Sequence, residues 1–204
     1  MDEWRDISEA FAFVGNSLLE PMSKTGDIAL DPSFWRRFPT FGNPGVGEAT
    51  EACEQWALKA SSSPDPVRAT SAEFAKLFLG PPRPAAAPWE TLYVEGNDGY
   101  GFGKPTFEMR DLLRSSGVAL SNANNQYEDH MGIELLYLSL LCSGAAEGNA
   151  DAEGQARSFA LAHPLAWIGQ LQEKVNEAIP SGYIACLLGL AHALLDCLCS
   201  DTFA

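Results

Sequence analysis

The sequence predicts an all-α fold, a single-domain bundle of about eight helices around one core. Three observations support this prediction. Apolar residues recur with helical spacing along almost the whole chain, β-branched residues do not alternate with polar ones as strands require, and no segment repeats with a fixed period. The 204 residues are 46% hydrophobic, which is enough for one sizeable core. We therefore expect residues 1–204 to form one helical domain.

The first part of the chain predicts four helices. The first has a single apolar stripe, made of Trp4, Ile7, Phe11, Val14 and Leu18. Pro21 ends this helix, and Pro32 fits the first turn of a short second one. A turn containing Gly and Pro leads into a third helix from about residue 48 to 60. A polar loop and a fourth helix follow, and Gly80 is the stop signal of that helix.

Residues 80–105 predict a long ordered loop. The segment is rich in proline and glycine and cannot form a continuous helix. It also carries the aromatic residues Trp89, Tyr93, Tyr100 and Phe102. A loop of this kind usually packs over the domain or forms a binding surface. The alternative is a disordered linker, although flexible linkers are rarely so aromatic.

The last part of the chain predicts four more helices. They cover roughly residues 105–117, 127–144, 152–178 with a break near Pro164, and 180–200. The final stretch, residues 183–199, is very apolar, but its length of about 17 residues is shorter than the ~20 that span a membrane. It also contains His192 and Asp196 and has no Lys or Arg beside it. A central core helix is the better interpretation.

The charge balance excludes several classes of partner. Acidic residues outnumber basic ones by 27 to 13, and the formal charge is -14. Such a surface repels phosphate backbones and anionic membranes and attracts cationic partners, so nucleic acid is not an expected ligand. The alternative is that the charge only maintains solubility. An acidic N-terminus without a secretory signal and five scattered cysteines suit reduced thiols in a cytoplasmic protein.

The sequence contains no established catalytic or cofactor motif. A nucleophile elbow, a phosphate loop, a zinc-protease motif and a dinucleotide fingerprint are all missing. The segment "GYGFGKPT" is only faintly similar to a phosphate loop, since it lacks a preceding strand and Lys104 is followed by proline. We therefore expect neither an enzyme nor a bound cofactor.

A cluster of titratable residues stands at the mouth of an apolar helix. The stretch "QYEDHMGIELLYLSLLC", residues 126–142, places Glu128, Asp129 and His130 in the first turn. Carboxylates complement the positive end of the helix dipole, so an N-cap role explains either acid. It explains His130 less well, because a charged imidazole is disfavoured there. Glu134, one turn further on, could hold this histidine.

This segment resembles a known family. "EDHMGIEL" is similar to the E-x-DH segment of the TorD/DmsD family of maturation chaperones for molybdenum-cofactor oxidoreductases. Four further stretches fit the family in the same order: "FAKLFLGP" (74–81), "APWETLYV" (87–94), "GFGKPTFEMRDLLRSSGV" (101–118) and "HPLAWI" (163–168). The resemblance covers roughly residues 70–200, and the order and spacing of the motifs are more specific than any one of them.

The resemblance implies a function without catalysis. It implies a cytoplasmic, all-helical chaperone that binds the twin-arginine signal peptide of a redox-enzyme precursor and delays export until the molybdopterin cofactor is inserted. The partners would be that peptide and the apo form of a molybdenum oxidoreductase. Such a peptide offers two guanidinium groups and an apolar stretch, so its receptor needs carboxylates beside a hydrophobic groove.

The resemblance also assigns roles to individual residues. Glu128 and Asp129 are the candidates for the arginine pair, and His130 would orient Asp129 or donate to a peptide carbonyl. The candidates for the apolar groove are Phe74, Leu77, Phe78, Trp89 and Tyr93. Those that shape the loops framing the groove are Gly80, Pro88 and Gly103. Leu77 and Phe78 could equally be core residues, whereas Trp89 lies in the proline-rich loop and off any helical stripe.

Two alternatives stay open. The chain could be a helical metal-binding or enzymatic protein that uses Asp129, His130 and Glu134, or a thiol such as Cys142. It could also be a nitrate-reductase-type assembly chaperone, whose groove would recognise an arginine-poor segment. The sequence is compatible with a monomer or a domain-swapped dimer.

Overall fold

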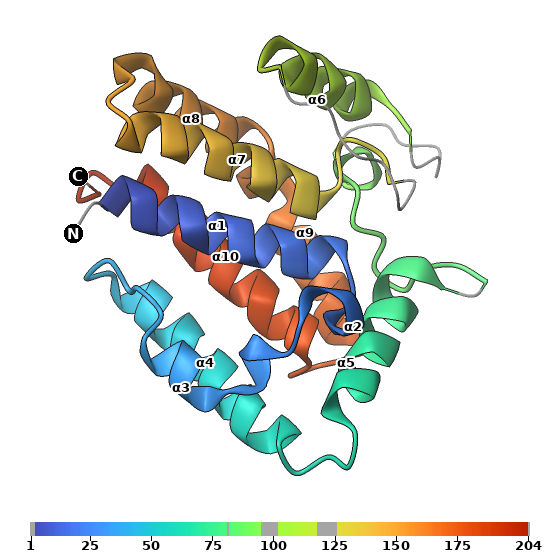
Figure 1. Cartoon of the computed structure of the whole chain (residues 1–204). Coiled ribbons are helices and arrows are strands. Elements are labelled where there is room, and N and C mark those ends of the chain that lie inside the picture. Colours follow the sequence, from blue (N-terminus) through green and yellow to red (C-terminus); the bar gives the residue numbers. More distant parts are fainter. Residues whose placement is uncertain (1–2, 81, 95–101, 118–125, 204) are drawn as a thin grey trace.

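The chain is all-α, as predicted, in a computed structural model that describes residues 3–80, 82–94, 102–117 and 126–203 (Figure 1). These residues form α1 (Glu3–Leu19), α2 (Met22–Thr25), α3 (Pro32–Arg36), α4 (Pro44–Ala60), α5 (Pro66–Phe74), α6 (Lys104–Ser115), α7 (Met131–Ala146), α8 (Ala150–Ala162), α9 (Pro164–Ala178) and α10 (Tyr183–Cys199). The described part thus has ten α-helices rather than about eight. The four-residue α2 was not expected, and the break at Pro164 separates two helices, α8 and α9.

The amphipathic stripe of α1 is buried, as its spacing predicts. Trp4 is 8% exposed, and Ile7, Phe11, Val14 and Leu18 are fully enclosed. Helix α1 lies alongside α7 (Figure 1). The first helix of the chain therefore packs directly on the apolar helix whose mouth carries the titratable residues.

Two glycines allow α1 and α7 to approach closely. A Cβ atom on Gly15 would lie 2.9 Å from the carbonyl oxygen of Gly132, and one on Gly132 would lie 2.7 Å from the carbonyl oxygen of Gly15. Distances this short leave no room for a side chain at either position. Close backbone approach is a use for which glycine is uniquely suited.

Helix α10 is the central core helix that its composition predicts. It packs against α4, α9 and α1, and most of its leucines are fully buried. Its first turn is held by Glu73 of α5, whose carboxylate accepts from the backbone N–H groups of Tyr183 at 3.2 Å and Ile184 at 2.8 Å. These bonds satisfy amides that a helix N-terminus leaves free. Over the described ranges, no helix has the combination of length and hydropathy that a membrane crossing requires.

Several helix boundaries follow from local capping. Helix α4 begins at Pro44, earlier than expected, because the Asn43 side chain accepts from Val46 N at 3.2 Å. Helix α5 continues as one π-helical turn, Ala75–Leu79, and Gly80 ends it, as predicted. Gly80 has φ +79°, and a Cβ there would lie 2.6 Å from the backbone of Arg83, so only glycine fits.

The proline-rich segment after Gly80 lies across the mouth of α7. Trp89 forms an isolated antiparallel bridge with His130. Its bonds are Glu90 N to the Asp129 carbonyl and Met131 N to the Pro88 carbonyl, both 2.9 Å. Pro81 and residues 95–101, which include the predicted loop aromatic Tyr100, lie outside the described residues. Residues 88–93 are thereby held against the predicted site.

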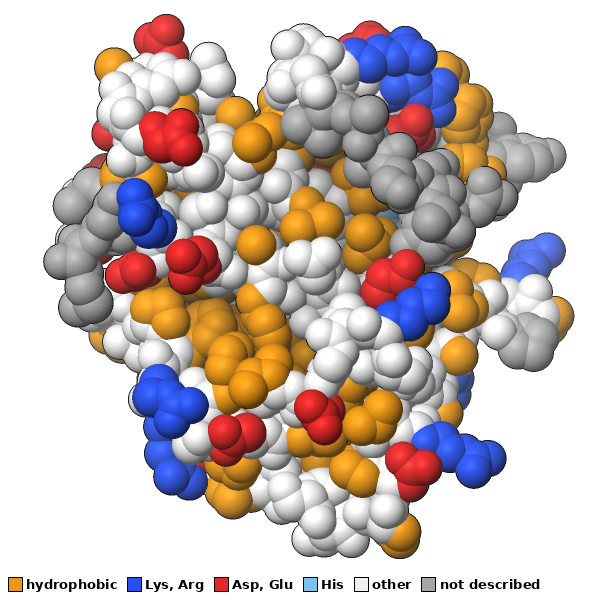
Figure 2. All heavy atoms as spheres, viewed as in Figure 1, with side chains coloured by type: hydrophobic (Ala, Val, Ile, Leu, Met, Phe, Trp, Pro, Cys, Tyr) orange, Lys and Arg blue, Asp and Glu red, His pale blue; other side chains and the backbone are white. Residues whose placement is uncertain are grey.

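Apolar side chains also reach the surface away from this site. Figure 2 shows a block of them between α1 and α3, flanked by acidic and basic side chains. A hollow of about 610 Å³ lies at this place, and Phe13, Phe34 and Phe38 form part of its lining. The three rings contact one another, with centroids 4.9 to 6.2 Å apart. They extend the core outward from Trp35, which is buried beneath them.

Candidate functional site

Asp129 is a buried carboxylate that joins three segments. Its Oδ2 accepts from Thr91 N at 2.9 Å and from Thr91 Oγ1 at 2.6 Å, and its Oδ1 accepts from Thr106 Oγ1 at 3.1 Å. The side chain is fully enclosed. Burial raises the pKa of Asp129, while the bonds from the two threonines oppose the shift. The expectation that this carboxylate faces a peptide is therefore wrong in this structure, because local donors already surround it.

His130 is itself the N-cap of α7. Its Nδ1 accepts a hydrogen bond from Gly132 N at 3.0 Å, and the side chain is 1% exposed. Burial lowers the pKa of His130 to about 3, so the imidazole is neutral at pH 7. This N-cap role differs from the sequence-based expectation that a cap explains His130 poorly. A neutral imidazole nitrogen is an acceptor, however, and it serves a free helix amide as a carboxylate would.

Glu134 bonds to Trp167 rather than to His130, contrary to expectation. Its Oε2 accepts from Trp167 Nε1 at 3.0 Å in the fully buried interior. Burial and the nearby charge of Glu90 raise the pKa of Glu134 well above its usual range. Glu90 in turn lies 2.9 Å from Nδ1 of His163. This buried network connects the loop at residue 90 to α7 and α9.

The proposed metal or catalytic centre of Asp129, His130 and Glu134 does not assemble. Asp129 is bonded to threonines, His130 to a backbone amide and Glu134 to a tryptophan. In the described part of the chain, no group of three or more His, Cys, Asp or Glu side chains is placed to hold a metal ion. These side chains serve the fold at the mouth of α7.

Glu128 is the predicted acid that reaches the surface. Its carboxylate forms a bidentate pair with Arg110 of α6, with Nε to Oε1 at 2.7 Å and the second nitrogen to Oε2 at 3.0 Å. The side chains of Glu128 and Arg110 are 18% and 31% exposed. The hydrogen bonds from Arg110 hold the pKa of Glu128 below its usual range. A guanidinium-binding carboxylate is thus present, and a guanidinium of the same chain occupies it.

Three of the predicted groove residues belong to the core. Phe74, Leu77 and Phe78 are 3%, 0% and 2% exposed, so the expectation that they line an open groove is wrong. They lie on the inner face of α5 and its π-helical turn, and helical stripes usually face the core. Tyr93 is half-buried, stacks on Trp167 at 5.2 Å and donates to the carbonyl of Ala87 at 2.8 Å.

Trp89 begins a chain of aromatic rings that runs to the surface. We call the set Trp89, Tyr127, Phe102 and Phe107 the aromatic surface. Successive ring centroids in this order are 5.7, 5.8 and 4.9 Å apart. Tyr127, Phe102 and Phe107 are 40%, 45% and 48% exposed, while Trp89 is half-buried. The Arg110 guanidinium lies 5.6 Å from the centroid of the Phe107 ring, so the aromatic surface borders the Glu128 pair.

The loop residues of the prediction hold this arrangement in place. Pro88 is buried and supplies the carbonyl that accepts from Met131 N. Gly103 is the N-cap of α6, and a Cβ there would lie 2.7 Å from Cγ2 of Thr91. The loop and the start of α6 therefore touch where Asp129 bonds to both.

The sequence does not predict the hydrogen-bond partners of Asp129 and Glu128. Thr91 and Thr106 enclose Asp129, and Arg110 engages Glu128. Thr106 and Arg110 both lie within the quoted "GFGKPTFEMRDLLRSSGV" motif, which was a usable signal. No sequence pattern predicts the exposure of Phe107 and Tyr127, because it depends on the position of α6 relative to the other helices.

The comparisons with known proteins show the family of this chain. Residues 43–173, well over half of the chain, match the sequence profile of the nitrate reductase delta subunit. The chain belongs to the nitrate reductase delta subunit family. The part that matches this family includes the aromatic surface, Glu128, Arg110 and the capped mouth of α7, and it excludes α1 to α3.

Curated relatives include proteins named chaperone protein TorD. The one from Vibrio cholerae serotype O1 is 32% identical over 131 residues, which are 62% of this chain and 59% of that protein. The one from Photobacterium profundum is 26% identical over 128 residues, 63% of this chain and 57% of that protein. The chain thus spans under three fifths of the length of each relative. The predicted TorD resemblance is confirmed.

Proposed function

We propose that the chain is a chaperone that binds the twin-arginine leader peptide of a molybdopterin oxidoreductase precursor. The name of its curated relatives supports the class, and the aromatic surface beside a guanidinium-binding carboxylate supports the ligand. In this proposal residues 1–204 act as one non-enzymatic domain in the cytoplasm. The partner is the apo-enzyme precursor. The site holds its leader until the cofactor has been inserted, and export follows.

The exposed aromatic surface is the observation that carries the proposal. Three large rings with 40% to 48% exposure stand together at one end of the bundle. Aromatic residues are enriched among the anchors of peptide and protein interfaces, because a few of them bury much apolar area. The apolar stretch that follows the arginines of a leader peptide would cover these rings.

Recognition of the first arginine proceeds by exchange in this proposal. Glu128 already holds the Arg110 guanidinium in bidentate geometry, so a peptide guanidinium can take the same two oxygens. Arg110 then remains over the Phe107 ring, where a cation is stabilised by the ring face. The acidic net charge of -14 draws a cationic peptide toward the site.

The second arginine needs a second acid. Asp111 is exposed on α6. The hydrogen bonds to Glu128 are the main cause of the raised pKa of Arg110, and the nearby charge of Asp111 adds to it. We assign Asp111 to the second guanidinium in place of Asp129, which is enclosed. Asp129 and His130 support the site from within, since they fix the loop, α6 and α7 relative to one another.

Trp89→Ala tests this proposal. The variant should bind a synthetic twin-arginine leader more weakly by about 2 kcal/mol, close to thirtyfold, because an anchor ring is lost. Isothermal titration calorimetry measures the affinity. Leu161→Ala removes an apolar side chain that is 60% exposed on α8 and should leave the affinity unchanged. Loss of helicity in Trp89→Ala by circular dichroism would instead make Trp89 a core residue.

A second candidate is an assembly chaperone for a nitrate-reductase-type enzyme. The description of the matched family favours it. The ligand would then be an arginine-poor segment of the client, which would cover the aromatic surface without displacing Arg110. Binding of such a segment should not respond to Glu128→Gln, whereas binding of a twin-arginine leader should weaken.

A further inference from the structure

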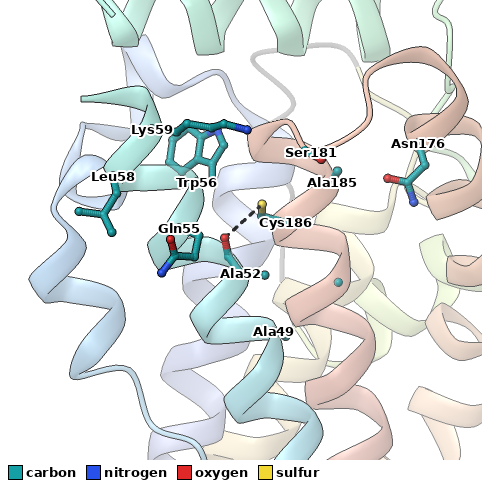
Figure 3. A pocket seen from close by; sticks show the side chains of 11 residues that line it. Ala49, Ala52, Gln55, Trp56, Leu58, Lys59, Asn176, Ser181, Ala185 and Cys186 are labelled. Carbon is teal, nitrogen blue, oxygen red and sulfur yellow. Dashed lines mark hydrogen bonds between the residues drawn. The ribbon is translucent and has the colours of Figure 1, made fainter. Parts of the chain in front are cut away.

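A second hollow of the molecule lies between α4 and α10, and it exposes a thiol. The cavity has a volume of about 720 Å³. Its lining is Ala49, Ala52, Gln55, Trp56, Lys59 and Cys186, among others. Figure 3 shows Cys186 at the centre of the cavity, with Trp56 and Lys59 on one side and Asn176 on the other. Cys186 is half-buried, so its sulfur is open to small molecules that enter this cavity.

A second thiol lies directly behind the first. Cys186 Sγ donates to the carbonyl of Ala52 at 3.8 Å, a contact drawn in Figure 3, and Cys53 is the next residue of α4. The Cys53 thiol is completely enclosed, and the two thiols are near enough that each shifts the pKa of the other. The chain therefore pairs an accessible thiol with an inaccessible one across two packed helices.

The contact makes the accessible member the better nucleophile. Interaction with the neighbouring Cys53 thiol lowers the pKa of Cys186, although burial and Glu73 oppose the shift. The same interaction and burial raise the pKa of Cys53. Tyr183 also lies close to both thiols, and Lys59 lines the cavity. Because the thiolate is the attacking species in thiol–disulfide exchange, reaction should begin at Cys186.

We propose that Cys186 and Cys53 are a reversible dithiol–disulfide pair, in which Cys186 attacks a low-molecular-weight disulfide that enters the cavity and Cys53 completes the exchange. The Cys186 thiolate attacks one sulfur of the incoming disulfide, which breaks its S–S bond and releases one thiolate. The product is a mixed disulfide at Cys186.

The second step uses the enclosed thiol. Cys53 transfers its proton to the released thiolate and attacks the Cys186 sulfur, and the second small thiol leaves. The two protein thiols are oxidised to a disulfide, and the incoming disulfide is reduced to two thiols. The new bond would cross-link α4 to the central core helix α10. This thiol proposal is independent of the leader-peptide proposal, since neither cysteine belongs to the aromatic surface.

Oxidised glutathione is the probe for the test. Full-length, reduced protein is incubated with it, and peptide mapping without reductant locates each modified cysteine. Wild-type protein should yield a Cys53–Cys186 disulfide, with loss of two hydrogens in the intact mass. Cys53→Ser should stop at a glutathione adduct on Cys186, and Cys186→Ser should yield neither product.

Cys199 provides the matched control, because it is also a half-buried free thiol of α10. Cys199→Ser should leave the cross-link unchanged. In Cys53→Ser, modification of Cys186 should be about tenfold faster than that of Cys199. Equal rates at the two cysteines, or a stable wild-type adduct at Cys186 without cross-link, would overturn the proposal. Circular dichroism of each reduced variant checks folding. If the serine disrupts the core, Cys53→Ala replaces Cys53→Ser in the adduct test alone, because alanine cannot interact with the Cys186 thiol as Cys53 does.

Discussion

His130 shows how burial decides the role of a single side chain. In solution an imidazole titrates near pH 6.5, and its charged form would be disfavoured at a helix N-terminus. Inside this protein the ring stays neutral and caps α7 through Nδ1. The sequence indicated correctly that this histidine is unusual. It could not indicate the reason, because the atoms that bury His130 come from distant parts of the chain, among them Phe78 and Trp89.

The depressed pKa of His130 predicts a loss of stability in acid. The folded pKa of about 3 lies below the unfolded value near 6.5, so the unfolded chain takes up the proton first as the pH falls. This contribution to stability is therefore present above pH 6.5 and is lost as the pH falls toward 3. Between pH 7.5 and 5.5, it should remove about 1.4 kcal/mol from the free energy of unfolding.

His130→Asn should abolish this part of the pH dependence. Asparagine can cap α7 in the same way but does not titrate. Urea denaturation gives the free energy of unfolding of both proteins at pH 7.5 and 5.5. The change with pH in the wild type minus the change in the variant isolates His130, because the opposite trend expected from Glu134 is common to both proteins. Glu134 has a raised pKa, so its contribution decreases as the pH rises. An unchanged pH dependence in His130→Asn would mean that the pKa of His130 is the same in the folded and the unfolded protein.

The α1–α7 crossing is the decisive contact between elements. We predict that Gly15→Ala destabilises the protein by about 1–3 kcal/mol, because the added methyl group would press on the Gly132 carbonyl. The free energy of unfolding in urea measures this cost. Gly169→Ala is the matched control, since nothing lies within 4 Å of a Cβ at that position of α9. That change should be neutral or stabilising by about 0.5–1 kcal/mol. Equal effects would show that the crossing tolerates a side chain.

Most elements could be predicted from the sequence, whereas their contacts could not. The stripe of α1, the stop at Gly80 and the break at Pro164 are local patterns, and the structure follows each of them. The sequence predicts the start of α7 about four residues too early, because the cap that defines it is a histidine. The burial of Asp129 and Phe78 differs from the prediction for a related reason. Burial is set by partners distant in sequence, and periodicity alone does not distinguish a core face from a binding face.

On the scale of the whole molecule, the site belongs to one end of a continuous core. The family match begins at residue 43, yet α1 packs along α7 and so supports the helix that carries His130. The buried Glu90, Glu134 and Trp167, with the partly buried His163, connect the loop, α7 and α9 behind the aromatic surface. The candidate site is therefore a surface of exposed rings and one carboxylate on a rigid support, as a preorganised receptor requires.

The central claim is that Glu128 recognises an arginine of a leader peptide. The most direct test is calorimetric titration of a twin-arginine leader and its Lys-Lys counterpart, each at two salt concentrations. We expect at least about tenfold weaker binding of the Lys-Lys peptide, since lysine cannot form the bidentate pair, and weaker binding of both peptides at high salt. Glu128→Gln should remove most of the difference between the peptides. Equal affinity of the folded wild-type protein for both peptides would show that Glu128 does not recognise an arginine of the leader.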